Sequence, residues 1–199
     1  MTIAESIQTR LRGTSDSRWD ARVSLGIAVF PDHDEDAEGL LKSADLALYA
    51  AKAAGRGALC LFSQEMRLNL LKKVVALENA RNAIREDQFT AFYQPLVILT
   101  SGAIVGFEAL LRWNHPDKGI LSPGVLQHAL DDGELAAAIG VVVLDKVLGD
   151  VRSWTEQGFN FGRVGINVTP LELSQSHFAR QFLERVQAFG LHPVPKTPS

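Results

Sequence analysis

The hydrophobic and polar positions of the chain switch repeatedly between a period of two residues and a period near 3.6 residues. These two periods are typical of strands and amphipathic helices, respectively. The expected strands cover residues 22–30, 58–62, 89–99, 103–113 and 163–168. The expected helices cover residues 3–12, 37–54, 63–85, 134–157 and 170–189. Strands and helices alternate in both halves of the chain, which predicts α/β architecture.

The segment 103–113 has the clearest strand pattern. One face carries Val105, Phe107, Ala109, Leu111 and Trp113, and the other carries Ile104, Gly106, Glu108, Leu110 and Arg112. Opposite charges on a largely apolar strand are costly unless they are paired or used. Two interpretations stay open: Glu108 and Arg112 form a salt bridge at the strand end, or Glu108 binds a cation and Arg112 binds an anion.

A second candidate for chemistry is Asn167, which alternates with Ile166 and Val168 on the last expected strand. A buried asparagine is most often an amide whose hydrogen bonds are satisfied within the core. Its carbonyl oxygen is also a suitable ligand for Mg²⁺ or Mn²⁺. Both interpretations remain open at this point.

Composition narrows the class of protein. Hydrophobic residues make up 46% and charged residues 22% of the 199 residues, the balance of a soluble globular protein. The net charge of -3 argues against a general nucleic-acid binder. Cys60 is the single cysteine, which excludes a disulfide framework and a cysteine-based zinc site. No apolar run approaches the roughly 20 residues of a membrane span, and we expect a cytoplasmic protein.

Three motifs identify a family. The sequences FYQPLV, EALLRWNHPDKG and INVTP occur in this order, and over roughly residues 70–190 the chain closely resembles the EAL domain. EAL domains are cyclic-di-GMP phosphodiesterases that fold as a variant TIM barrel. The resemblance implies that Glu108 and Asn167 bind Mg²⁺ or Mn²⁺, and that Gln94, Leu110 and Arg112 bind cyclic-di-GMP.

The first part of the chain resembles the end of a GGDEF domain, which has a ferredoxin-like, cyclase-type fold. The stretches VSLGIAVFP and ADLALYAAKAAGRG carry this resemblance. The GGDEF motif itself occurs nowhere in the sequence, so we expect no diguanylate cyclase activity. Lys52 and Arg56 match positions that contact nucleotide phosphates in the family. Without the rest of that site, we expect them to be solvated residues at a helix end.

The two resemblances predict the domain organisation. We expect a truncated GGDEF domain over residues 1–63, a connector helix over 64–86, and a truncated EAL domain over 87–199. The second domain would then be an incomplete TIM barrel, because the fold typically needs about 250 residues. The final residues, HPVPKTPS, contain three prolines and suggest a frameshift or a premature stop.

Three hypotheses for function follow. The chain is part of a phosphodiesterase whose complete form hydrolyses cyclic-di-GMP to pGpG, and is inactive by itself. Alternatively, it is a non-catalytic module that binds cyclic-di-GMP, forms a homodimer, or contacts an intact GGDEF or EAL protein. The third hypothesis is a non-functional truncated product. We favour the third for the chain as given, whereas the motif residues imply the first, and whether the chain is an enzyme stays open.

Overall fold

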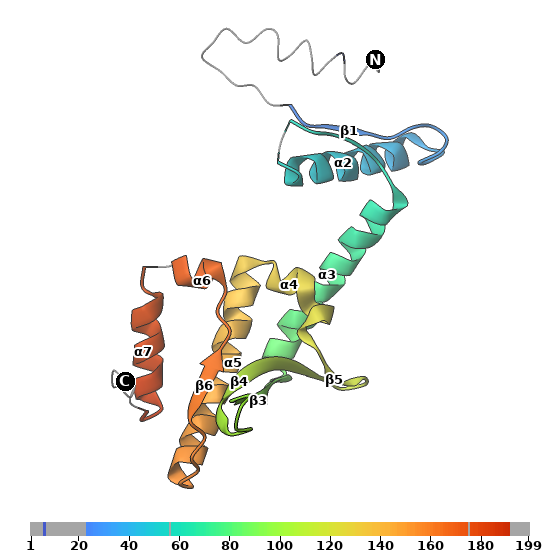
Figure 1. Ribbon diagram of the computed structural model, residues 1–199. Coiled ribbons are helices and arrows are strands. Elements are labelled where there is room, and N and C mark those ends of the chain that lie inside the picture. Colours follow the sequence, from blue (N-terminus) through green and yellow to red (C-terminus); the bar gives the residue numbers. More distant parts are fainter. Residues whose placement is uncertain (1–5, 7–22, 56, 175, 192–199) are drawn as a thin grey trace, which may run out of the picture. The chain divides into compact units, whose positions relative to one another are not determined.

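The computed structural model describes residues 6, 23–55, 57–174 and 176–191 (Figure 1). Its contacts divide the chain into two compact units, residues 1–73 and 74–199, which are described separately. The elements of the first unit are β1 (Leu25–Ile27), α2 (Ala37–Ala53) and β2 (Leu59–Leu61), and α3 (Gln64–Arg85) runs across the boundary. The elements of the second unit are β3 (Phe89–Val97), β4 (Ile104–His115), β5 (Gly119–Leu121), η1 (Pro123–Leu126), α4 (Gln127–Leu130), α5 (Gly133–Glu156), β6 (Arg163–Ile166), α6 (Pro170–Ser174) and α7 (Phe178–Ala188).

The first unit is a parallel pair of strands, β1 and β2, with α2 packed against it. A side chain at Gly26 of β1 would lie 2.2 Å from the backbone of α2, so this close approach requires glycine. Asp36 caps α2, because its side chain accepts a hydrogen bond of 2.8 Å from the backbone N–H of Gly39. The expected strands and helix are present, although β1 is much shorter than the expected strand over residues 22–30. The helix expected over residues 3–12 lies almost wholly outside the described residues.

The second unit is built on a sheet whose central strand is β4. Strand β3 pairs with it antiparallel, from Phe89 opposite Trp113 to Val97 opposite Ile104. Strand β5 pairs antiparallel with the end of β4, and β6 pairs parallel with its first half, from Gly106 opposite Arg163. The parallel connection from β4 to β6 includes α5, as α/β folds require. The short elements β5, η1 and α4 were not expected from the sequence pattern.

One face of this sheet forms the core with the helices. The core cluster includes Phe89, Trp113, Leu126 and Ile139, each at most 5% exposed. Phe89 and Trp113 lie directly opposite each other in the β3–β4 pair, so both rings point to the same side. Figure 1 shows α5 running along the sheet. The period-two prediction holds from Phe107 to Trp113, because Ala109 and Trp113 are buried on the helix side. It fails at Val105, which is 36% exposed and lies where the β3–β4 register shifts.

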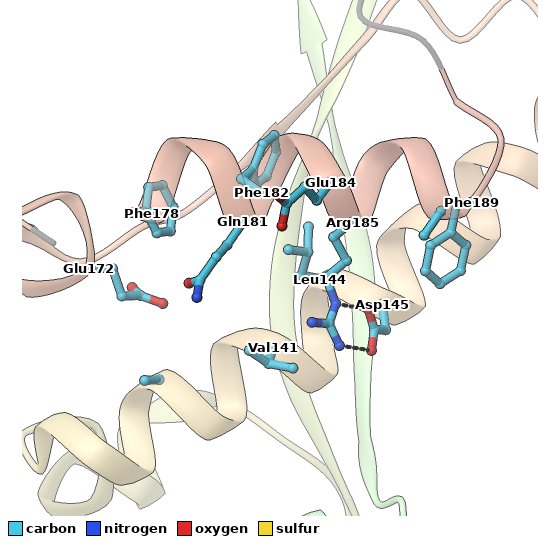
Figure 2. Close-up of a pocket in the computed structure, with 12 residues that line it drawn as sticks. Val141, Leu144, Asp145, Glu172, Phe178, Gln181, Phe182, Glu184, Arg185 and Phe189 are labelled. Atoms are coloured by element: carbon cyan, nitrogen blue, oxygen red, sulfur yellow. Dashed lines mark hydrogen bonds and ion pairs between the residues drawn. The ribbon is translucent and has the colours of Figure 1, made fainter. Parts of the chain in front are cut away.

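The single helix expected over residues 170–189 is wrong. The structure has two helices, α6 and α7, separated by a polar segment that includes Ser176 and His177. Serine side chains compete for backbone hydrogen bonds, which disfavours a continuous helix. Helix α7 pairs with α5 through Arg185, whose guanidinium donates to both carboxylate oxygens of Asp145 (Figure 2). Between the two helices lies an apolar groove of about 620 Å³.

Candidate functional site

The face of the sheet opposite the core carries the candidate residues; we call it the polar face, formed by Gln94, Glu108, Leu110, Arg112 and Asn167. Gln94 of β3 lies directly opposite Glu108 of β4 in the antiparallel pair, so both side chains project from the same face. Glu108 is paired with Gly165 in the parallel β4–β6 ladder, and Asn167 follows two residues later. The structure therefore aligns one polar residue from each of three adjacent chain segments.

Glu108 and Asn167 are in direct contact. The side-chain amide of Asn167 donates a hydrogen bond of 2.8 Å to Oε1 of Glu108. Asn167 lies just past the last residue of β6 and is exposed, while Glu108 is partly buried. Residues at the carboxyl ends of parallel strands are where TIM-barrel and open α/β folds place their ligands. Because Asn167 is exposed, its interpretation as a buried core amide is wrong.

Arg112 does not pair with Glu108 in the part of the chain that the structure describes. Its Nη1 donates to the carbonyl oxygen of Leu111 at 2.7 Å, and its guanidinium carbon lies 5.8 Å from the ring centroid of Phe92. That distance is within the range of a cation–π interaction. The salt-bridge interpretation of Glu108 and Arg112 is therefore wrong, because each group has a different partner.

Phe92 is a residue of the polar face that sequence reasoning missed. It lies opposite Leu110 in the β3–β4 pair and is 47% exposed. The signal was present in the sequence, because Phe92 is two residues before Gln94 and must share its face in a strand. Phe92 and Leu110 together form an apolar patch between Glu108 and Arg112.

A second missed residue is Glu172, in the short helix after Asn167. Oε2 of Glu172 accepts hydrogen bonds from the backbone N–H and the Oγ1 hydroxyl of Thr169, at 2.8 and 2.7 Å. In return, the Glu172 N–H donates to Oγ1 of Thr169 at 3.3 Å. This reciprocal arrangement is a capping box, whose signature is a threonine followed by a glutamate three residues later. The sequence TPLE contains that signature.

A cavity of about 300 Å³ adjoins these residues. Its lining includes the polar residues Arg112, Asn167, Thr169 and Glu172 and apolar residues of β4 and α5. A cavity with apolar walls and a few convergent polar groups is typical of small-molecule sites.

The donor atoms at the polar face fit part of a divalent-cation site. The carboxylate of Glu108 and the side-chain carbonyl of Asn167 are hard oxygen donors, which Mg²⁺ and Mn²⁺ prefer. Among the residues that the structure describes, however, no group of three or more histidine, cysteine, aspartate or glutamate side chains could hold a metal. The two residues therefore supply a fraction of an oxygen shell.

The remaining candidate residues lie in the first unit. Lys52 is exposed in the last turn of α2. Arg56 lies outside the described residues.

The β4–α5–β6 unit, in which a helix connects two parallel strands, is the repeating unit of the TIM-barrel class. The family profile of the EAL domain matches residues 77–194, and that of the diguanylate cyclase GGDEF domain matches residues 1–58. The chain belongs to the EAL domain family and carries part of a GGDEF domain before it.

Two relatives illustrate the similarity. The chain is 32% identical over 195 residues to the bifunctional diguanylate cyclase/cyclic di-GMP phosphodiesterase MucR of Pseudomonas aeruginosa, covering 96% of this chain and 28% of that protein. It is 33% identical over 172 residues to the cyclic di-GMP phosphodiesterase PdeR of Escherichia coli, covering 86% of this chain and 26% of that protein. The chain thus spans little more than a quarter of either relative.

Solved structures agree on the fold. The MucR phosphodiesterase in complex with c-di-GMP superposes with a TM-score of 0.55 at 29% identity, over 59% of this chain and 48% of that chain. The FimX EAL domain of Xanthomonas citri superposes with a TM-score of 0.53 at 18% identity, over 63% and 48% of the two chains, and supports the fold alone. In the described part of the chain, every helix is too short or too polar to cross a membrane.

Proposed function

We propose that this chain supplies part of the substrate site of a cyclic-di-GMP phosphodiesterase, and that the polar face binds the dinucleotide. The observation that carries the proposal is the alignment of Gln94, Glu108 and Asn167 across β3, β4 and the end of β6. Two relatives that are named as cyclic di-GMP phosphodiesterases support the choice of ligand.

Each residue of the polar face has a role suited to its chemistry. Arg112 binds a phosphate oxygen, because its planar fork can donate two parallel hydrogen bonds. Leu110 lines the region that receives a guanine base, and Gln94 donates or accepts hydrogen bonds at the substrate. Glu108 and Asn167 hold Mg²⁺ or Mn²⁺ as oxygen ligands. When bound, such a cation supplies Lewis-acid activation of a water for attack on phosphorus.

Turnover requires more ligands than Glu108 and Asn167 provide. Mg²⁺ takes about six oxygen ligands in near-octahedral geometry, and waters alone would leave the cation weakly held. We therefore propose that this chain by itself binds cyclic-di-GMP without hydrolysing it. A non-catalytic binding module is therefore the second candidate function. It is supported by the alignment of candidate ligand residues on the polar face, while the described residues contain no cluster of metal-binding acids.

The test measures binding and turnover separately. Isothermal titration of cyclic-di-GMP in the presence of Mn²⁺ is carried out with the unchanged chain, Arg112→Ala and Asn167→Ala. Arg81→Ala, at an exposed arginine of α3, is the matched control. We expect Arg112→Ala to weaken binding at least ten-fold and Arg81→Ala to leave it unchanged. Chromatography of the same mixtures detects pGpG.

The outcomes separate the hypotheses. Binding without pGpG supports the binding module, and metal-dependent pGpG production contradicts the proposed inactivity of this chain. Equal affinities of the unchanged chain and Arg112→Ala would refute the substrate site. Absence of any binding by the unchanged chain would refute the proposed substrate site, and would leave the protein-contact module and the non-functional product as the remaining hypotheses.

The proposal includes an assignment of segments. Residues 1–63 are the GGDEF part, residues 64–86 the connector and residues 87–199 the EAL part. Lys52 and Arg56 have no role in this site. The protein partners that we propose are a second copy of the chain or an intact GGDEF or EAL protein.

A further inference from the structure

We infer that Glu172 is a positioning residue, which holds Asn167 in place through its capping box with Thr169. The inference rests on the proposed function, in which Asn167 binds a cation beside Glu108. Glu172 does not touch substrate or cation in this assignment. It acts on the three-residue connection between β6 and α6.

The connection is held at both of its ends. At one end, Ile166 is paired with Ala109 in the parallel β4–β6 ladder. At the other end, Thr169 gives two hydrogen bonds to the same oxygen of Glu172, at 2.8 and 2.7 Å. Only Asn167 and Val168 lie between these two anchors, so little freedom remains in the backbone that carries the Asn167 amide.

The carboxylate of Glu172 is itself held in a defined space beside α5. A Cβ atom at Gly140 of α5 would lie 2.7 Å from Oε1 of Glu172, closer than real Cβ contacts allow. The absence of a side chain at Gly140 therefore permits the carboxylate to lie there. Hydrogen bonds to an ionised carboxylate are stronger than neutral ones, so the cap is well suited to fix the loop.

Glu172 lies in the first turn of α6, directly after the connection from β6, and takes no part in the Arg185–Asp145 pair between α5 and α7. Figure 2 shows Glu172 at the end of the groove away from the Arg185–Asp145 pair. Helix α6 spans five residues, Pro170–Ser174. Such a short helix adds little by itself to the fold. What the cap determines most directly is where the chain enters α6, and hence where Asn167 lies.

Three variants test the inference on the full chain. Glu172→Ala removes the cap. Glu172→Gln keeps a side-chain oxygen that can accept from Thr169, since glutamine also serves in capping boxes. Gly140→Ala leaves Glu172 present but displaces its carboxylate, and it favours the α5 helix because alanine has the higher helix propensity. Glu156→Ala, in the exposed ion pair with Arg152, is the matched control.

The main readout is the pair of side-chain amide signals of Asn167 in ¹H–¹⁵N spectra, assigned by their loss in Asn167→Asp. We expect these signals to move in Glu172→Ala and Gly140→Ala, and to stay in place in Glu172→Gln and Glu156→Ala. We also expect the Mn²⁺ dissociation constant to rise about ten-fold in Glu172→Ala, the usual effect of losing a residue that orients a ligand. Thermal unfolding of each variant is recorded in parallel, and Gly140→Ala should melt no lower than the unchanged chain.

Two results would overturn the inference. The first is an unchanged pair of Asn167 signals in Glu172→Ala. The second is a change confined to Glu172→Ala and accompanied by a lower melting temperature, with Gly140→Ala unaffected, because Glu172 would then act through overall stability. If Mn²⁺ binds to none of the proteins while the Asn167 signals respond as expected, the positioning of Asn167 stands and the proposed cation role fails.

Discussion

The phenol of Tyr93 donates a hydrogen bond of 2.6 Å to Oδ2 of Asp150, although 57 residues separate them in the chain. Tyr93 is on β3 and Asp150 on α5, and the Tyr93 ring also packs edge-on against Trp154. Successive residues of a strand point to opposite faces. Tyr93 therefore holds β3 against the helix layer and leaves its neighbour Gln94 on the polar face.

The Tyr93–Asp150 contact predicts a loss of stability at alkaline pH. Burial, the hydrogen bond to Asp150 and the charge of Asp150 all raise the pKa of Tyr93 above its usual value. An unfolded tyrosine ionises near pH 10, whereas Tyr93 in the folded protein stays protonated to a higher pH. The contribution of Tyr93 to the free energy of unfolding is thus fully present below about pH 10, and it decreases as the pH rises above that value.

The measurement compares urea unfolding of the unchanged chain and Tyr93→Phe at pH 8 and pH 11. At pH 8 we expect Tyr93→Phe to lower the free energy of unfolding by about 1–2 kcal/mol, the value of a hydrogen bond to a charged group after partial exposure. At pH 11 the difference between the two proteins should be smaller. An equal difference at both pH values would contradict the assigned role of Tyr93.

We expect the close contact between Gly106 of β4 and β6 to affect ligand binding. A Cβ at Gly106 would lie 2.4 Å from the carbonyl oxygen of Arg163, its partner on β6. Gly106→Ala should therefore displace β6, lower the free energy of unfolding by about 1–3 kcal/mol, and weaken cyclic-di-GMP binding because β6 leads to Asn167.

The control for Gly106→Ala is Gly124→Ala, where the nearest atom to a new Cβ is 3.9 Å away. Both variants are examined by urea unfolding and by titration with cyclic-di-GMP. Gly124→Ala should match the unchanged chain in affinity. If Gly106→Ala kept full affinity, the position of β6 would not control the polar face.

Substitution of Phe92 should weaken cyclic-di-GMP binding by a smaller factor than substitution of Arg112. Its ring lies under the Arg112 guanidinium, so Phe92→Leu removes the cation–π contact while keeping an apolar side chain. Exposed contacts of this kind contribute about 0.5–1 kcal/mol, which corresponds to a two- to five-fold weaker binding of cyclic-di-GMP. Phe92→Tyr keeps the ring and should bind as the unchanged chain does. Equal affinity of Phe92→Leu and Phe92→Tyr would exclude a role for the ring.

The core of the second unit gives a prediction about stability. Phe89 is 1% exposed and packs in the cluster with Trp113, whereas Phe159 is 60% exposed. Phe89→Ala should lower the free energy of unfolding by about 3–5 kcal/mol, because it removes buried surface and leaves a cavity. Phe159→Ala makes the same chemical change at the surface and should cost less than about 1 kcal/mol. Urea unfolding of both variants distinguishes the two sites.

Local sequence patterns predicted some elements better than others. The long strand β4 and helix α5 were expected within a few residues, because each repeats its apolar period many times. The break between α6 and α7 was missed, since the apolar spacing continues across it while the polar residues Ser176 and His177 interrupt the helix. The three-residue strand β5 was missed because it is too short for a period to be recognised.

The sequence by itself determined which residues of β4 share a face, because alternation is a property of the extended backbone, and its motifs identified the EAL family. It also placed Asn167 near the end of a strand. Only the tertiary structure decided that Asn167 donates to Glu108, which is 59 residues away, and that Arg112 lies over Phe92 instead of pairing with Glu108. These contacts depend on strand register and on the path of the β4–α5–β6 crossover, which are set by packing between distant segments and not by local periodicity.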